Sequence, residues 1–397
     1  MASKKLWSFE MPWKEVDLMN IRKEFVLESF KEQSSFKDLC RRYGISTKTG
    51  YKWVKRFEQG GMGSLVDQSR RPHRSPHRLS EDEICELIRL KQAHRHWGPY
   101  KIQQLYEENH GTAPSASSVK RVLDKAGLVK HRKRRPQGNS ERIVNPMQPA
   151  APNQLWTVDF KGWWLTQSKD RCEPLTVRDE YSRYIIAVRA MNATRSEIVR
   201  QEFETVFGEY GLPDLIRSDN GPPFAANNSP LGLSRLSAWW ISLGIGLDRI
   251  APGHPEQNGG HERMHRDIKW ELQRHPRNNL IAQQEAFDAW RNDFNTIRPH
   301  EYWNQQPPAR FYVKSDNKYE GTPDMIMYPD DFITRKVLKN GRIKLENRSI
   351  SVTTALAGYE VGLKYLTQNE VEVHFDYLKI GTIDLQAKAF IHADQHV

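Results

Sequence analysis

The stretch LIRSDNGPPF, residues 215–224, joins a short apolar run to an Asp-Asn-Gly turn. The run predicts a strand, and the turn after it places Asp219 at the strand's carboxyl end. Asn220, next in the turn, either orients Asp219 or serves the turn itself. An acid in this position is a candidate metal ligand, because side chains at strand ends gather at one edge of a sheet.

Two further acids have settings that suggest a function. Asp159 lies inside the strand-like run LWTVDF, where a lone carboxylate is costly to bury unless a cation neutralises it. Glu262 lies in HPEQNGGHERMHRDIK, residues 254–269, one turn into a helix predicted to begin at Asn258.

Oxygen ligands from separate elements that converge at a sheet end suit Mg²⁺ or Mn²⁺. Two such ions about 4 Å apart can activate a nucleophile and stabilise the leaving oxygen in phosphoryl transfer. Helical spacing puts a set of polar side chains on the face of Glu262, where the cations can contact DNA phosphate and the histidine can support the site. The set is His265, Arg266 and Lys269.

The segments around these acids alternate between strand-like and helical patterns, which predicts an α/β domain over about 150–312. The expected strands are 155–160, 174–178, 184–190 and 215–218, and the expected helices are 194–210, 234–243 and one from 258 past 270.

The front of the chain reads as a helix-turn-helix domain over residues 1–66. One helical face at 36–43 ends at Gly44, and Ser46 can cap a second helix over 47–58, with Tyr51, Val54 and Phe57 on its apolar side. A basic second helix of this kind fits a DNA major groove. The candidate DNA contacts on it are Lys48, Lys52, Lys55 and Arg56.

A cationic, proline-rich linker at 67–79 leads to a second helical unit at 80–136. Ser80 and Glu83 form an expected capping box, and either Ser115 or Ser117 caps the last helix. The unit ends in a basic tail that is expected to track DNA phosphates. Its candidate contacts are Lys130, Arg132, Lys133, Arg134 and Arg135.

Residues 332–385 contain short β-rich runs separated by glycine and asparagine, which predicts a small β barrel. The whole chain is thus expected to be multidomain. The net charge of +11 favours a polyanionic partner. No apolar run is long enough to span a bilayer, so no membrane partner is expected. Three widely spaced cysteines indicate a reduced, cytoplasmic protein.

Several motifs in sequence order resemble the integrase core of insertion-sequence transposases, which is related to retroviral integrases and ribonuclease H. They are VRDEYSRYIIAV at 177–188, GLPDLIRSDNG at 211–221, HPEQNGGHERMHRDIK and IRPHEYWNQQPPARFY at 297–312. The resemblance covers about 154–312, and the front helices resemble the helix-turn-helix segments of the same transposases.

This resemblance implies a ribonuclease-H-like core with a mixed five-stranded sheet. It implies that Asp159, Asp219 and Glu262 hold two Mg²⁺ or Mn²⁺ ions and catalyse 3′-end cleavage and strand transfer. The implied partner is double-stranded DNA, both transposon ends and target, bound by a homo-oligomer in a bacterial cytoplasm at the nucleoid. Asp179 matches a family position that is usually structural, and it can cap its turn or pair with Arg183.

Three alternatives stay open on the residues alone. Glu256 competes with Glu262 as third ligand. His261 to His265 reads H-E-x-x-H, a motif of zinc metallopeptidases, with Glu285 downstream as a third zinc ligand. A non-catalytic DNA-binding regulator would bind DNA without using the carboxylates.

Overall fold

The computed structural model describes residues 17–31, 35–69, 78–129, 147–250, 255–323 and 325–393. The basic tail at 130–135 lies outside these residues. The chain divides into two compact units, residues 1–78 and 79–397. None of the described helices is long and apolar enough to cross a membrane.

The first unit is a helix-turn-helix around one small core. It contains α1 (Leu18–Ser29), α2 (Phe36–Arg42), α3 (Thr47–Gly60) and the short helix η1 (Met62–Leu65). Gly44, with φ +64°, follows α2, and the Ser46 hydroxyl accepts from the Thr49 amide at 3.2 Å, so both expected caps are present.

The expected apolar side of α3 was partly wrong. Trp53 is buried in the core, whereas Tyr51 is 61% exposed and stacks on Phe36 with ring centroids 4.2 Å apart. Gly50 permits the close approach of α3 to α2, since a Cβ there would lie 2.7 Å from the Cys40 sulfur. The core residues Gly50 and Trp53 therefore follow helical spacing, but one position away from the expected stripe.

The second unit begins with a three-helix bundle of α4 (Glu81–Ala93), α5 (Pro99–His110) and α6 (Ala116–Lys125). The capping box of Ser80 and Glu83 is present. Ser115, not Ser117, caps α6 by accepting from the Ser118 amide at 3.3 Å.

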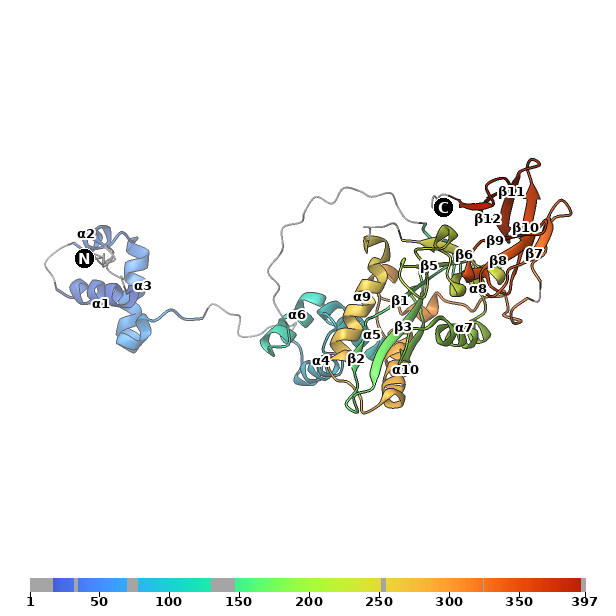
Figure 1. The fold of residues 1–397 in the computed structure, drawn as a ribbon. Helices are drawn as coiled ribbons and strands as arrows, with labels where there is room; N and C mark the ends of the chain where they lie inside the picture. The colour runs from blue at the N-terminus through green and yellow to red at the C-terminus, as the bar shows by residue number, and fades with distance from the viewer. Residues whose placement is uncertain are drawn as a thin grey trace, which may run out of the picture. The chain divides into compact units, whose positions relative to one another are not determined.

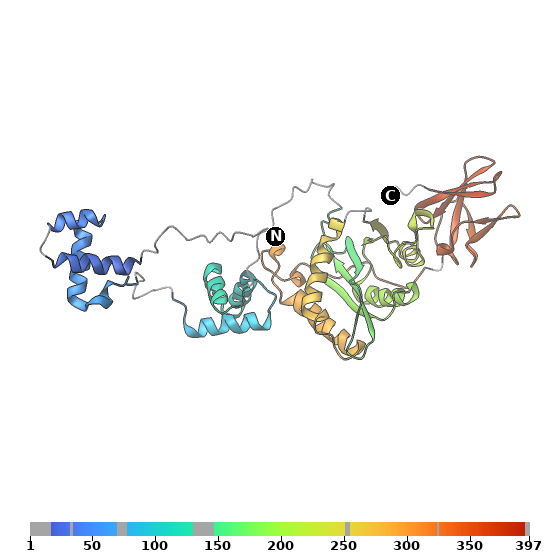
Figure 2. The same ribbon diagram turned by 60° about the vertical axis from the view of Figure 1, so that its left-hand side comes forward.

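The central domain is a mixed sheet with helices on both faces (Figure 1; Figure 2). Its main strands run in the order β4-β3-β1-β5-β6, and the two-residue β2 (Trp164–Leu165) also pairs with β3. β3 is antiparallel to β1 and β4, and β5 is parallel to β1 and β6. The main strands are β1 (Leu155–Phe160), β3 (Arg171–Asp179), β4 (Ile185–Met191), β5 (Leu215–Ser218) and β6 (Gly246–Arg249).

Two apolar layers flank this sheet. On one face α7 (Ser196–Tyr210) and α8 (Arg235–Ser242) pack on Trp156 and Val158 of β1. On the other, α9 (Gly259–Ile268), the π-helical turn η4 (Lys269–Gln273) and α10 (Leu280–Thr296) pack on β3 and β4. Because side chains alternate along a strand, Thr157 and Asp159 face the α9 layer.

The carboxyl-terminal β unit is not a closed barrel in the described residues. Its main sheet is open and antiparallel, in the order β13-β12-β11-β10-β7, and β8 and β9 form a separate hairpin. The hairpin contributes Ile343 and Ile350 to the core of the main sheet, and it contacts both edge strands, β7 and β13, without pairing with either in a ladder. The strands are β7 (Ile333–Lys336), β8 (Arg342–Leu345), β9 (Arg348–Ser351), β10 (Glu360–Tyr365), β11 (Glu370–Phe375), β12 (Leu378–Asp384) and β13 (Ala389–His392).

Helix α8 joins the central domain to the β unit. Trp239 and Trp240 pack in the sheet core, whereas Ala238 and Ile241 pack in the core of the β unit. Every residue of α8 after Arg235 is buried, as expected for a helix that is covered on both sides.

Candidate active site

The register of β1 and β5 brings Asp159 and Asp219 to the same end of the sheet. Thr157 of β1 pairs with Arg217 of β5 in a parallel arrangement, and each candidate acid comes two residues later. Asp159 is the more enclosed of the two, and Asp219 is exposed in its turn, where it accepts from the Gly221 amide at 3.2 Å. Burial, with the nearby charge of Asp219, raises the pKa of Asp159 to about 7.

Asn220 does not contact Asp219 through its side chain. Its amide nitrogen instead donates to the carbonyl oxygen of Ile250 at 2.8 Å, which ties the turn to the end of β6. The structure therefore gives Asn220 a role in holding the loop.

Helix α9 crosses the strand that carries Asp159. Asn258, just before the helix, donates to the Asp159 carboxylate at 3.2 Å. The side chains of His261 and His265 point toward the sheet. One ring nitrogen of each histidine and one carboxylate oxygen of Asp159 all lie within 4.8 Å of one another. Glu262, between them, is exposed and lies outside this cluster.

The two histidines meet at one threonine. Thr176 is the cross-strand partner of Asp159, and its hydroxyl donates to the Asp159 backbone carbonyl at 2.8 Å. The same hydroxyl lies 3.2 Å from Nδ1 of His261 and 2.8 Å from Nε2 of His265. A hydroxyl has one proton, so both imidazole nitrogens must donate to it. Thr176 was not among the residues expected from the sequence.

Both imidazoles are held neutral. Burial lowers the pKa of His265 to about 3, with smaller contributions from Lys161 and Arg178, and burial lowers that of His261 well below its usual range. His265 donates the proton on its Nε2 to the Thr176 hydroxyl. The Nδ1 of the same neutral ring therefore carries no proton, and it lies 3.9 Å from the Asp159 carboxylate.

A glycine and an arginine fix the start of α9, and sequence reasoning missed both. A Cβ on Gly260 would lie 1.9 Å from the guanidinium of the buried Arg178. Arg178 forms an ion pair with Glu180. A side chain at this position would require the guanidinium of Arg178 to move away from the first turn of the helix.

Of the two structural roles expected for Asp179, capping its turn or pairing with Arg183, the structure shows the first. It is fully buried and accepts from the Asn153 amide at 2.8 Å and the Ser182 amide at 2.7 Å, so it caps the turn. Burial raises its pKa. Arg183 pairs with Glu180, not with Asp179.

The expected basic residues have mixed settings. On α3, Lys48, Lys52 and Lys55 are exposed and Arg56 is half-buried; the Lys52 amine and the Arg56 guanidinium lie 5.1 Å and 5.0 Å from the Trp53 ring centroid. Arg266 and Lys269 are exposed along α9 and η4, on the side of Glu262.

The metallopeptidase reading of His261 and His265 is not supported. The third member of the described cluster is Asp159, and Glu285 is exposed on α10 outside it. The same imidazoles are hydrogen-bonded to Thr176 in the sheet.

Comparison with known proteins identifies the domains. Models of the integrase core domain match residues 149–255 and 243–308. A homeodomain-like model matches 49–123, and a helix-turn-helix model matches 22–73.

The relatives include mobile-element proteins. An uncharacterised 31.7 kDa protein of insertion element IS407 from Burkholderia multivorans is 27% identical over 237 residues, covering 59% of this chain and 82% of that protein. The transposase of transposon Tn552 from Staphylococcus aureus is 24% identical over 275 residues, 63% of this chain and 54% of that protein. Among solved structures, the HTLV-2 integrase catalytic core in complex with magnesium is 17% identical with a TM-score of 0.33, over 42% of this chain and all of that one. These matches identify integrase core domain segments over residues 149–308 and helix-turn-helix segments in the front of the chain, and the chain as a whole is similar to proteins of insertion elements and transposons.

Proposed function

We propose that Asp159, Asp219 and Glu262 form the catalytic centre and hold two Mg²⁺ or Mn²⁺ ions while the protein cuts at transposon ends and joins the 3′ ends to target DNA. The observation that carries this proposal is the parallel register of β1 and β5, which sets two carboxylates at one sheet end.

The donor set fits hard divalent cations. Asp159 is half-buried and near the charge of Asp219, so its negative form is destabilised in the metal-free protein. A cation between the two acids would remove that cost, and carboxylate oxygens are the ligands that Mg²⁺ prefers. When bound, such a pair activates the attacking oxygen and stabilises the leaving oxygen.

Glu262 is supported by the direction of side chains on a helix. Helical side chains point back toward the amino terminus, so Glu262 covers the turn at Asn258 and Gly259. Asn258 contacts the Asp159 carboxylate.

The protein's other residues would bind and orient DNA. Arg266 shares the exposed side of α9 with Glu262 at i+4, where a guanidinium can hold a phosphate next to the acids. The units at 1–66 and 80–136 would bind terminal inverted repeats, with the linker at 67–79 and the basic tail at 130–135 on phosphates. The core at 150–312 would act in a homo-oligomer, because synapsis of two DNA ends needs more than one protomer.

A cleavage and strand-transfer assay tests the centre. The substrate is a duplex that contains the element's end, with Mg²⁺ or Mn²⁺, and the variants are Asp159→Asn, Asp219→Asn, Glu262→Gln and Glu256→Gln. We expect the first three to lose both reactions and keep DNA binding, and Glu256→Gln to stay active. Activity that persists in Glu262→Gln and disappears in Glu256→Gln would reassign the third ligand, and activity in either aspartate variant would refute the centre.

A further inference from the structure

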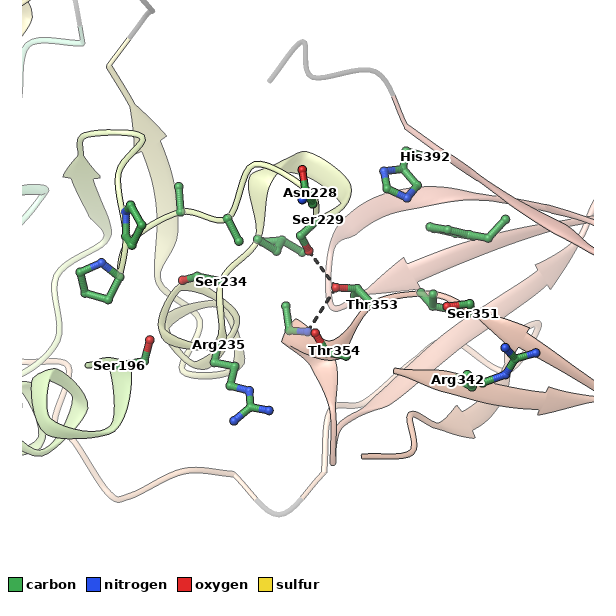
Figure 3. Close-up of a pocket in the computed structure, with 18 of the residues that line it drawn as sticks. Ser196, Asn228, Ser229, Ser234, Arg235, Arg342, Ser351, Thr353, Thr354 and His392 are labelled. Atoms are coloured by element: carbon green, nitrogen blue, oxygen red, sulfur yellow. Dashed lines mark hydrogen bonds between the residues drawn. The ribbon is translucent and has the colours of Figure 1, made fainter. Parts of the chain in front are cut away.

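The loop that follows Asp219 and the β unit enclose a cleft of about 850 Å³, here called the loop–sheet cleft (Figure 3). One wall is formed by the core, from Pro222 to Arg235, and the other by β8, β9 and β13 with the turns beside them. In Figure 3, Arg235 lies on the core wall, and Arg342 and His392 lie on the wall of the β unit.

The described residues that line this cleft carry cations and hydroxyls and include no carboxylate. The cations are Arg235, Arg342 and Lys388, and the hydroxyl-bearing residues are Ser196, Ser229, Ser234, Ser349, Ser351, Thr353 and Thr354. Phe390 adds a half-buried aromatic ring. Glu197 lies outside the lining and forms a 3.7 Å ion pair with Arg235 in which both side chains are exposed.

The two walls are fixed relative to each other. Leu233 and Ile241 of the core pack in the same apolar cluster as the strands of the β unit. The Ser229 hydroxyl lies 2.8 Å from the Thr353 hydroxyl, a hydrogen bond that bridges the walls (Figure 3). The cleft is therefore formed before any ligand binds, and little ordering entropy opposes binding.

The core wall is also continuous with the candidate active site. Pro222 lines the cleft and lies three residues after Asp219. Asn220 fixes one end of the loop to Ile250, and Arg249 fixes the other by donating to the Gly232 carbonyl at 3.1 Å. A polyanion that leaves the acids along this loop meets the cations of the cleft.

We propose that the loop–sheet cleft binds the sugar–phosphate backbone of a DNA strand that extends from the candidate active site. The proposal rests on the proposed function for the direction of the strand. Arginine and lysine bind phosphate oxygens through charge, and serine and threonine hydroxyls add uncharged donors to the same backbone. Contacts to sugar and phosphate carry no sequence information, so the proposed cleft would position DNA without regard to its sequence.

The test is the salt dependence of DNA binding by the full chain, measured by fluorescence anisotropy in the presence of a chelator. The probes are a labelled random-sequence duplex and the matching single strand. The cleft variant combines Arg235→Ala, Arg342→Ala and Lys388→Ala. The matched control removes the same charge from exposed residues of the β unit outside the cleft, by Lys336→Ala, Lys339→Ala and Lys344→Ala.

Each phosphate contact contributes about 0.9 to the slope of log K against log salt for duplex DNA and about 0.7 for a single strand. If all three cations contact phosphates, the cleft variant should lose about 2.7 of the duplex slope or about 2.1 of the single-strand slope. The control should lose much less on both probes. The probe that shows the loss identifies the bound form of DNA.

An unchanged slope for the cleft variant on both probes, or an equal loss in the control, would overturn the proposal. The three cleft side chains are exposed or half-buried, so a melting curve by circular dichroism should match that of wild type and exclude unfolding as the cause. Because the measurement needs no metal and no cleavage, its result is independent of the catalytic proposal. Failure of wild type to cut DNA in Mg²⁺ would refute the catalytic centre and leave the cleft standing.

Discussion

Substitution of Thr176 by valine tests whether the imidazole contacts position the active-site helix. Valine keeps the shape of threonine, so it leaves no cavity. It removes three hydrogen bonds: one to the Asp159 carbonyl and one from each of His261 and His265. Each hydrogen bond contributes about 1 kcal/mol net to stability, so the free energy of unfolding should fall by about 3 kcal/mol. His261 is fully buried, so after the substitution its ring N–H would keep only its hydrogen bond to the Thr157 backbone, and no water could replace the hydroxyl.

This free energy holds α9 against β3, and α9 carries Glu262. If half of this loss is added to the activation free energy of cleavage, because the helix is displaced, cleavage at saturating DNA slows by about tenfold, since about 1.4 kcal/mol is a factor of ten in rate. DNA affinity should not change, since the threonine faces the protein interior. The assay is single-turnover end cleavage over a range of DNA and Mg²⁺ concentrations, with the folded fraction checked by circular dichroism.

Thr176→Ser is the matched control. It retains the hydroxyl and loses one methyl group, which costs about 0.8 kcal/mol of burial. A valine variant that cuts at the wild-type rate, or a serine variant that slows as much as valine, would refute the reasoning. A loss confined to DNA affinity would refute it as well.

Three other perturbations have expected outcomes. Gly260→Ala should destabilise the protein by about 1–3 kcal/mol in urea unfolding and slow cleavage, because its Cβ meets the Arg178 guanidinium 1.9 Å away; an alanine variant of wild-type stability and activity would contradict the contact. Asp248→Asn should lower the free energy of unfolding by about 3 kcal/mol in the same measurement, because loss of the 2.6 Å ion pair would leave the Arg217 guanidinium, which is 3% exposed, without its charged partner. The substitution Asp330→Asn, at an exposed position, is the control. Removal of divalent metal by a chelator should abolish end cleavage and preserve gel-shift binding, and loss of both together would argue against separate binding and catalytic domains.

The sheet and two of its acids followed from local sequence patterns. In LWTVDF, alternation separates Trp156 and Val158 from Thr157 and Asp159, and the structure puts the two pairs on opposite faces. An apolar strand that ends in Asp-Asn-Gly predicts a carboxylate at the sheet end, and the parallel partner places a second one beside it. Both inferences needed only the two-residue period of a strand.

Long-range contacts could not be predicted in this way. Helical spacing on α3 allowed a stripe through Tyr51 or one through Trp53, and the choice depends on how α3 packs on α2 at Gly50. Thr176 looked like an ordinary strand residue, since its meaning comes from a helix about 85 positions later. The strand patterns of the β unit could form a barrel, but the structure has an open sheet whose core is covered by the hairpin of β8 and β9.

The H-E-x-x-H spacing on α9 shows how one local pattern can serve two chemistries. His261 and His265 are four residues apart, so they share one side of the helix, and Glu262 lies about 100° round from His261. In this chain the histidine side faces Thr176 and Asp159 in the sheet, and the glutamate side faces solvent with Arg266. The histidines therefore attach the helix to the sheet through Thr176, next to the strand that carries Asp159, and that attachment leaves Glu262 exposed on another side of the helix. A sequence motif fixes which side chains share a helix face, but the groups packed against that face decide whether they bind zinc or hold a helix in place.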